Sequence, residues 1–227
     1  MLRSTLYFYI IFLLISFYLA AFPQADIQFS RLFYHGDKQF MIKHYLTGES
    51  YYYEFLIRRV ALPFLVCFIL IFPIFLKIVP VLGNFFKNLF FKITDIVFIY
   101  LSAILLGVFV NIVLKIGWGR ARPNDISEFG GDKIFTPWIQ ISDQCATNCS
   151  FVSGDASAGF FFACLYIINK NKNYFYFSVF AGLLFGFMRI GAGAHFLSDI
   201  LMSFIIVNLL LKIFHIIYYS FLKWIKV

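Results

Sequence analysis

Long apolar runs recur along the chain and constrain its fold more than any other feature. Of the 227 residues, 62% are hydrophobic and only 13% are charged. A soluble protein of this length exposes more surface than so few charged side chains can cover. Lipid must therefore replace water around most of this surface, and the sequence predicts an all-α integral membrane protein.

The apolar runs predict six transmembrane helices within one domain, residues 1–227. A hydrocarbon core about 30 Å thick needs roughly 20 apolar residues per helix. The first run ends in Leu19-Ala20-Ala21-Phe22, a poor signal-peptidase site, so we expect a retained helix, with a cleaved leader as the alternative. The predicted spans are residues 5–22, 60–76, 93–114, 151–168, 174–194 and 196–215.

An even number of spans places both termini on one side of the membrane. Lys and Arg normally concentrate on the cytoplasmic side, but here nine of the 19 lie on the terminal side and ten on the other. Of the 11 carboxylates, only Asp95 lies with the termini. This asymmetry favours cytoplasmic termini, although acidic residues determine topology only weakly.

Two cysteines, Cys145 and Cys149, lie in the long polar loop 124–150. A disulfide between them requires an oxidising compartment, which would place the loop outside the cytoplasm. Two free thiols are the alternative, and two ligands alone make a weak case for zinc. Cys67 and Cys164 fall within predicted spans, where a thiol acts as a small apolar side chain.

The first of three polar blocks follows the third span. Lys115, Arg120 and Arg122 concentrate positive charge beside the bilayer, and Pro123 loosens the backbone after them. Such a cluster can bind a phosphate group. The alternative is that these side chains snorkel or bind lipid headgroups, as cations at membrane ends commonly do.

The second polar block, Ser153-Gly154-Asp155, opens the fourth span. A helix start presents N–H groups and a positive dipole end to a phosphate oxygen, and glycine permits close approach. The alternative is an ordinary cap, with Ser153 as the N-cap and Asp155 in the first turn.

The third block contains Arg189, His195 and Asp199. His195 and Asp199 are four residues apart and share a helix face, so the carboxylate can hold one ring nitrogen and leave the other as a nucleophile or base. A structural pair is the alternative, but ionisable residues within a membrane are usually functional.

Alternating spans bring the three blocks to one membrane face, at the ends of spans three and five and the starts of spans four and six. Three cations around a His–Asp pair suit phosphoryl transfer, which depends on positioning and charge stabilisation. The sequence therefore predicts a phosphate site at the periplasmic ends of spans three to six.

With these motifs in this order, the sequence resembles the type 2 phosphatidic acid phosphatase superfamily of membrane lipid phosphatases and soluble vanadium haloperoxidases. The stretches Trp118–Pro123, Gly131–Phe135 and Gln144–Ser157 resemble the lipid A 4'-phosphatases of Gram-negative bacteria in particular. The resemblance implies a phosphoric monoester hydrolase of the bacterial inner membrane that acts on lipid A and not on nucleic acid. The alternatives are another lipid phosphate or diphosphate (lipid A 1-phosphate, phosphatidylglycerophosphate or undecaprenyl diphosphate) or an inactive lipid-binding member.

The resemblance also implies a role for each residue. His195 would attack phosphorus to form a phosphohistidine, Asp199 would orient the ring, and no metal or other cofactor is implied. The phosphate oxygens would be bound by Lys115, Arg122, Ser153, Gly154 and Arg189.

One position departs from the superfamily pattern, because Asp155 replaces a histidine that protonates the leaving oxygen. A sugar hydroxyl is a poor leaving group, yet an aspartic acid beside three cations is normally ionised. Three explanations remain: desolvation keeps Asp155 protonated as the general acid, His35 or His44 supplies the proton, or Asp155 is structural.

Overall fold

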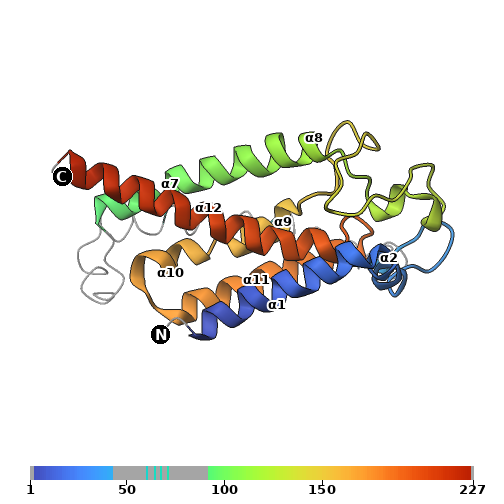
Figure 1. The fold of residues 1–227 in the computed structure, drawn as a ribbon, viewed down its shortest axis with the longest axis horizontal. Helices are drawn as coiled ribbons and strands as arrows, with labels where there is room; N and C mark the ends of the chain where they lie inside the picture. The colour runs from blue at the N-terminus through green and yellow to red at the C-terminus, as the bar shows by residue number, and fades with distance from the viewer. Residues whose placement is uncertain are drawn as a thin grey trace.

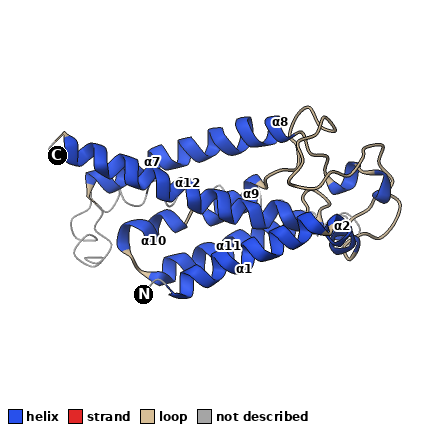
Figure 2. Ribbon diagram, viewed as in Figure 1, coloured by secondary structure: helices blue, strands red, loops and turns tan. Residues whose placement is uncertain are grey.

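The computed structural model describes residues 3–42 and 92–225, together with residues 60, 64, 67 and 71. Within these residues every regular element is a helix, as predicted, and two isolated β-bridges join loops (Figure 2). Three helices are long and apolar enough to cross a membrane, and a bent helix pair makes a fourth candidate. The predicted span at residues 60–76 lies outside the described residues apart from four of its positions.

The first span continues into a helix that the sequence analysis did not predict. Helix α1 (Arg3–Ala21) meets α2 (Pro23–Arg31) at an angle of 101°. Pro23 occupies the start of α2, where its missing N–H costs nothing, while it cannot continue α1. The bend turns α2 across one end of the molecule and buries Asp26.

The third predicted span agrees closely with the structure. Helix α7 (Ile93–Val108) continues through a π-helix, η3 (Phe109–Leu114), into the short α8 (Lys115–Trp118). Gly119 ends α8 in the left-handed region at φ 58°, where a side chain would collide with the Ser142 carbonyl oxygen. This stop directs the chain out of the bundle at the first polar block.

The fourth predicted span, 151–168, is not one continuous helix. It forms α9 (Gly154–Phe160) and α10 (Ala163–Asn169), because Ser153 caps α9 and a turn at residues 161–162 interrupts the helix. The predicted spans 174–194 and 196–215 correspond to α11 (Lys172–Gly191) and α12 (Leu197–Trp224). Helix α12 runs beyond its predicted end, where Tyr218 and Tyr219 bond to the start of α7.

The helices pack lengthwise into a bundle in which α1 lies against α12 and α9 lies against α11 (Figure 1). At the α9–α11 contact the backbones approach so closely that a Cβ on Gly159 would lie 2.6 Å from Gly182. Small residues permit this close approach of helices in membranes. Rings of Phe12, Phe175 and Phe204 fill the space between α1, α11 and α12.

The termini lie at one end of the bundle, and α2 lies with the long loop 119–153 at the other (Figure 1). Trp138 anchors this loop to the bundle, because its indole N–H donates to the Ser16 carbonyl of α1 at 2.7 Å. The predicted disulfide between Cys145 and Cys149 is formed and closes a tight ring in the same loop. Two short 3₁₀ helices, η4 (Pro123–Asp125) and η5 (Ser127–Phe129), fold the remainder.

Candidate phosphate site

His195 lies at the loop end of the bundle, between α11 and α12. Gly193 turns the chain there at φ 66°, where a Cβ would collide with the ring of Phe40. The His195 side chain is 3% exposed, and its Nδ1 lies 2.7 Å from the carbonyl oxygen of Ser150. Because a carbonyl oxygen only accepts, Nδ1 carries the proton and Nε2 carries the lone pair.

Asp199 lies close to His195 as predicted, but its shortest contacts are with other groups. Its Oδ2 is 3.8 Å from Nδ1 of His195, farther than the Ser150 carbonyl. The carboxylate instead accepts from the Ser150 hydroxyl at 2.5 Å and the Phe196 N–H at 2.8 Å, and it pairs with Arg120 at 2.6 Å. Asp199 therefore holds the start of α12 and Ser150, and Ser150 in turn holds the His195 ring.

Burial keeps His195 neutral. Burial lowers the pKa of His195 to about 4 against the opposing attraction of Asp199, and the nearby guanidinium groups of Arg122 and Arg189 contribute to the lowering. At neutral pH the imidazole is therefore uncharged, which is the form in which Nε2 can attack an electrophile.

Arg122 and Lys115 contact different parts of the site. Arg122 donates to Asn148 twice, to its backbone carbonyl at 2.8 Å and its side-chain oxygen at 2.7 Å. Asn148 lies inside the disulfide ring, so the loop fixes this guanidinium. The Lys115 ammonium lies over Gly154, 3.4 Å from the position that a Cβ would occupy. Glycine therefore leaves the space beside this ammonium free of a side chain.

The second polar block forms a cap, as its structural alternative predicted. Ser153 is the N-cap of α9, with its hydroxyl 3.4 Å from the Ala156 N–H. Asp155 in the first turn forms an ion pair with Arg189, whose Nε lies 3.1 Å from the carboxylate. The Asp155 side chain is 25% exposed, so burial desolvates it only in part.

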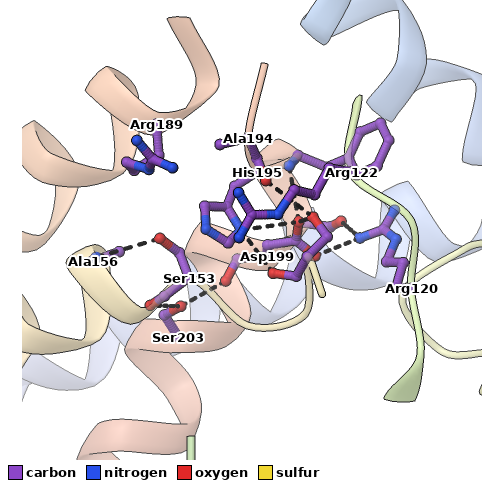
Figure 3. Close-up of polar contacts among 12 residues, drawn as sticks. Arg120, Arg122, Ser153, Ala156, Arg189, Ala194, His195, Asp199 and Ser203 are labelled. Carbon is purple, nitrogen blue, oxygen red and sulfur yellow. Dashed lines mark hydrogen bonds and ion pairs between the residues drawn. The ribbon is translucent and has the colours of Figure 1, made fainter. Parts of the chain in front are cut away.

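The structure brings all eight predicted site residues to the same end of the bundle. Figure 3 shows Ser153 and Arg189 on one side of His195, and Arg122 with Arg120 on the other. Of the two other predicted proton donors, His35 lies in the turn after α2, and His44 lies outside the described residues. The eight residues are Lys115, Arg122, Ser153, Gly154, Asp155, Arg189, His195 and Asp199.

Three residues at the site escaped the sequence analysis: Asp26, Asn148 and Ser150. Arg120 was predicted as a member of the cation cluster in the first polar block, but not as a partner of Asp199. A carboxylate four residues after an apolar span is an available signal for Asp26, because a charge at such a position requires a partner. The described residues contain no group of three or more His, Cys, Asp or Glu side chains that could hold a metal ion.

Apolar helices of membrane-spanning length end at a neutral histidine among cations, an arrangement that suits phosphoryl transfer at a membrane. A family comparison agrees: the PAP2 superfamily model matches residues 96–223, and the chain belongs to this superfamily. It is therefore a lipid phosphatase that hydrolyses phosphate monoesters.

Sequence comparison refines the relationship. The chain is 39% identical over 190 residues to a lipid A 4'-phosphatase of Francisella tularensis subsp. novicida, covering 79% of each chain. It is 32% identical over 199 residues to a lipid A 4'-phosphatase of Rhizobium leguminosarum, covering 82% of this chain and 83% of the relative. No solved structure matches the chain at a significant level.

Proposed function

We propose that this protein removes the 4'-phosphate of lipid A at the periplasmic face of the bacterial inner membrane, through a phosphohistidine on His195. The observation that carries the proposal is the neutral, buried His195, whose Nδ1 is held by a carbonyl while Arg122 and Arg189 lie near it. Lys115 lies beside Gly154, at the start of α9. Similarity to lipid A 4'-phosphatases supports the choice of lipid.

In the proposed reaction, Nε2 of His195 attacks phosphorus and the bond from phosphorus to the sugar oxygen breaks. The departing oxygen takes up a proton from water, and the three cations stabilise the charge on the equatorial oxygens. Water then attacks the phosphohistidine, the N–P bond breaks, and inorganic phosphate leaves. Ser150 keeps the proton on Nδ1 throughout, so that Nε2 remains the nucleophile.

Asp155 acts in this proposal by orienting Arg189. Its carboxylate lies 3.1 Å from Arg189 Nε. A carboxylate that binds this guanidinium holds a cation in place for the phosphate oxygens. The ion pair therefore favours the structural explanation of this departure from the superfamily pattern over the general-acid explanation.

An apolar cavity beside the site supports a lipid substrate. It has a volume of about 160 Å³ and lies between α7, η3 and α9. Leu106, Val110 and Phe161 line its apolar part, while Asn111 and Gly154 lie at its polar side. An acyl chain in this cavity would bring its headgroup to Gly154 and Lys115.

A lipid diphosphate is the second candidate substrate, and Asp155 is the observation that favours it. A phosphate leaving group needs little protonation, so a diphosphate phosphatase tolerates the loss of the superfamily histidine. The two substrates make different demands on the site, which a direct comparison of hydrolysis rates resolves.

Mass spectrometry of lipid A tests the proposed substrate. Lipid A from cells that express the chain should lack one phosphate on the distal glucosamine, whereas lipid A from cells expressing His195→Asn should retain it. Unchanged lipid A, together with release of phosphate from a purified lipid diphosphate, would replace the first candidate with the second.

The proposed topology has six spans with the site in the periplasm. Support comes from the shared end of the two termini and from a disulfide, which forms in oxidising compartments. Alkaline phosphatase fused after Asn148 should be active, and the same enzyme fused after Lys170 should be inactive. The reverse pattern would place the site in the cytoplasm.

A further inference from the structure

Arg120 has the largest fully buried side chain of the described residues, and its guanidinium contacts protein groups on several sides. Its plane lies against the ring of Phe196, with the central carbon 4.3 Å from the ring centre. A guanidinium is planar and presents its donors in a rigid fork, so contacts on several sides fix its position. Its polar partners are Asp26 at 2.9 Å, Asp199 at 2.6 Å, the Ser198 hydroxyl at 2.8 Å and the Thr136 carbonyl at 2.8 Å.

Asp26 reaches the same place from a distant part of the chain. It lies on α2, outside residues 96–223 that define the superfamily match. Besides Arg120, its carboxylate accepts from the Ser198 backbone N–H at 3.1 Å and from the Ser198 hydroxyl. Asp26 therefore binds the first turn of α12, next to Asp199.

A continuous series of ion pairs and hydrogen bonds, called here the path, runs from Asp26 through Arg120 and Asp199 to His195. Asp26 pairs with one end nitrogen of Arg120, and Asp199 pairs with the other. Asp199 accepts from the Ser150 hydroxyl, and the Ser150 carbonyl holds Nδ1 of His195. The Ser150 N–H also donates to the Arg120 carbonyl at 2.9 Å, so Arg120 and Ser150 are linked through the backbone as well.

We propose that Asp26 and Arg120 are positioning residues of the phosphatase, which hold Asp199 and, through Ser150, set the direction of the His195 ring. This inference rests on the proposed role of His195 as nucleophile. It makes the bent N-terminal helix pair, α1 and α2, part of the catalytic apparatus. Without Asp26, the guanidinium of Arg120 would retain only one carboxylate partner, Asp199, to fix its orientation.

Positioning predicts a specific kinetic pattern. The side-chain hydrogen bonds of Asp26 go to Arg120 and Ser198, and neither residue is proposed to bind the phosphate, so substrate affinity should be unchanged when Asp26 is altered. A small misplacement of a nucleophile lowers the rate of the chemical step about 10- to 100-fold. Asp26→Asn should therefore lower kcat by about this factor and change KM by less than twofold.

The test compares purified Asp26→Asn with wild type and Asp95→Asn, using nitrophenyl phosphate as substrate and correcting each rate for the folded fraction. Asp95 is a matched control, because it also caps a helix start but lies at the opposite end of the bundle. Asp95→Asn should leave kcat within twofold of wild type. Equal corrected kcat values for the two variants would refute the positioning role.

A double-variant cycle examines the path through Asp199. Asp199→Asn already interrupts the path, so adding Asp26→Asn should lower kcat by less than twofold more, whereas independent effects would multiply. Multiplying effects would refute the path. If the double variant does not fold, the comparison with Asp95→Asn decides.

The same experiment separates failure of this inference from failure of the proposed function. Hydrolysis that needs His195 but is insensitive to Asp26→Asn would refute the positioning role alone. Hydrolysis that survives His195→Asn would refute the proposed nucleophile, and with it the positioning role.

Discussion

Each end of the bundle contains an aspartate that caps the start of a helix, but the two aspartates have different surroundings. Asp199 and Asp95 are each the third residue of a helix, and each accepts from the N–H of its N-cap residue, at 2.8 Å and 3.0 Å. Asp199 is fully buried against Arg120, whereas Asp95 is partly exposed and takes its other bond from Tyr219. A capping aspartate thus becomes part of a candidate site only where other segments cover it.

Two histidines repeat this contrast along α12. His195 precedes the helix among guanidinium groups, while His215 lies near its other end, packed against the rings of Phe98 and Tyr219. The difference teaches that residue type and helix position do not distinguish a structural histidine from a reactive one. The charges brought by neighbouring elements make the distinction.

The largest expected effect contrasts the two histidines. His195→Asn should reduce phosphate release by roughly 10⁴-fold or more, because positioning groups cannot replace a lost nucleophile. His215→Asn should retain activity within a few fold. Both variants should elute as folded protein on size exclusion. Near-normal phosphate release by His195→Asn would show that His195, like His215, is not the nucleophile.

The two capping aspartates give the next contrast. Asp199→Asn should lower kcat by about 10²–10³-fold, because the amide no longer balances Arg120 or holds Ser150. It should also destabilise the fold by about 3 kcal/mol or more, since a buried guanidinium loses a partner. Asp95→Asn should cost about 1 kcal/mol of unfolding free energy with no loss of kcat. Thermal unfolding and phosphate release together measure both effects.

A third expectation concerns Asp155, which contacts a site cation and not the nucleophile. Asp155→Asn should weaken catalysis about 10-fold through displacement of Arg189, and equally for a sugar phosphate and for nitrophenyl phosphate. Equal loss is expected because Arg189 binds the phosphate group, which both substrates share. A loss of about 10²–10⁴-fold confined to the sugar phosphate would identify Asp155 as the general acid instead.

Reduction of the disulfide should have a smaller effect, on substrate binding. The Cys145–Cys149 ring contains Asn148, which holds Arg122 by two hydrogen bonds. Opening the ring should loosen Arg122 and raise KM about 3- to 10-fold with little change in kcat. A variant with both cysteines changed to serine should show the raised KM without reductant and no further response to it. A reductant effect that persists in this variant would exclude the ring as its cause.

The last expected effect is the pH dependence of stability, which involves no change in catalysis. His195 is neutral in the folded protein down to pH about 4, whereas in the unfolded chain it takes up a proton near pH 6.5. The unfolded state therefore binds more protons between these values, and the free energy of unfolding falls as pH falls from 6.5 to 4. The Tm of the wild type should fall further than that of His195→Asn over this interval. Equal falls in Tm would show that burial does not lower the pKa of His195.

The sequence by itself determined the lipid surroundings, the helical class and the extents of α7, α11 and most of α12, because hydropathy over a bilayer length reports them directly. It also predicted which residue types gather at one end. The pairing of Cys145 and Cys149, one of two alternatives left open by the sequence, was decided by the structure. The sequence did not reveal the bend at Pro23 into α2, which depends on packing at one end of the bundle. It also did not reveal the break between α9 and α10, which depends on packing within the bundle.

Only the tertiary structure decided the partners of the buried charges. The spacing of His195 and Asp199 predicted their proximity, but Ser150 holds the ring and Arg120 pairs with the carboxylate. Arg120 is separated from Asp26 by 94 residues and from Asp199 by 79. A buried charge pairs with a group on whichever segment the fold brings within a few ångströms. Local sequence patterns do not show which segment that is.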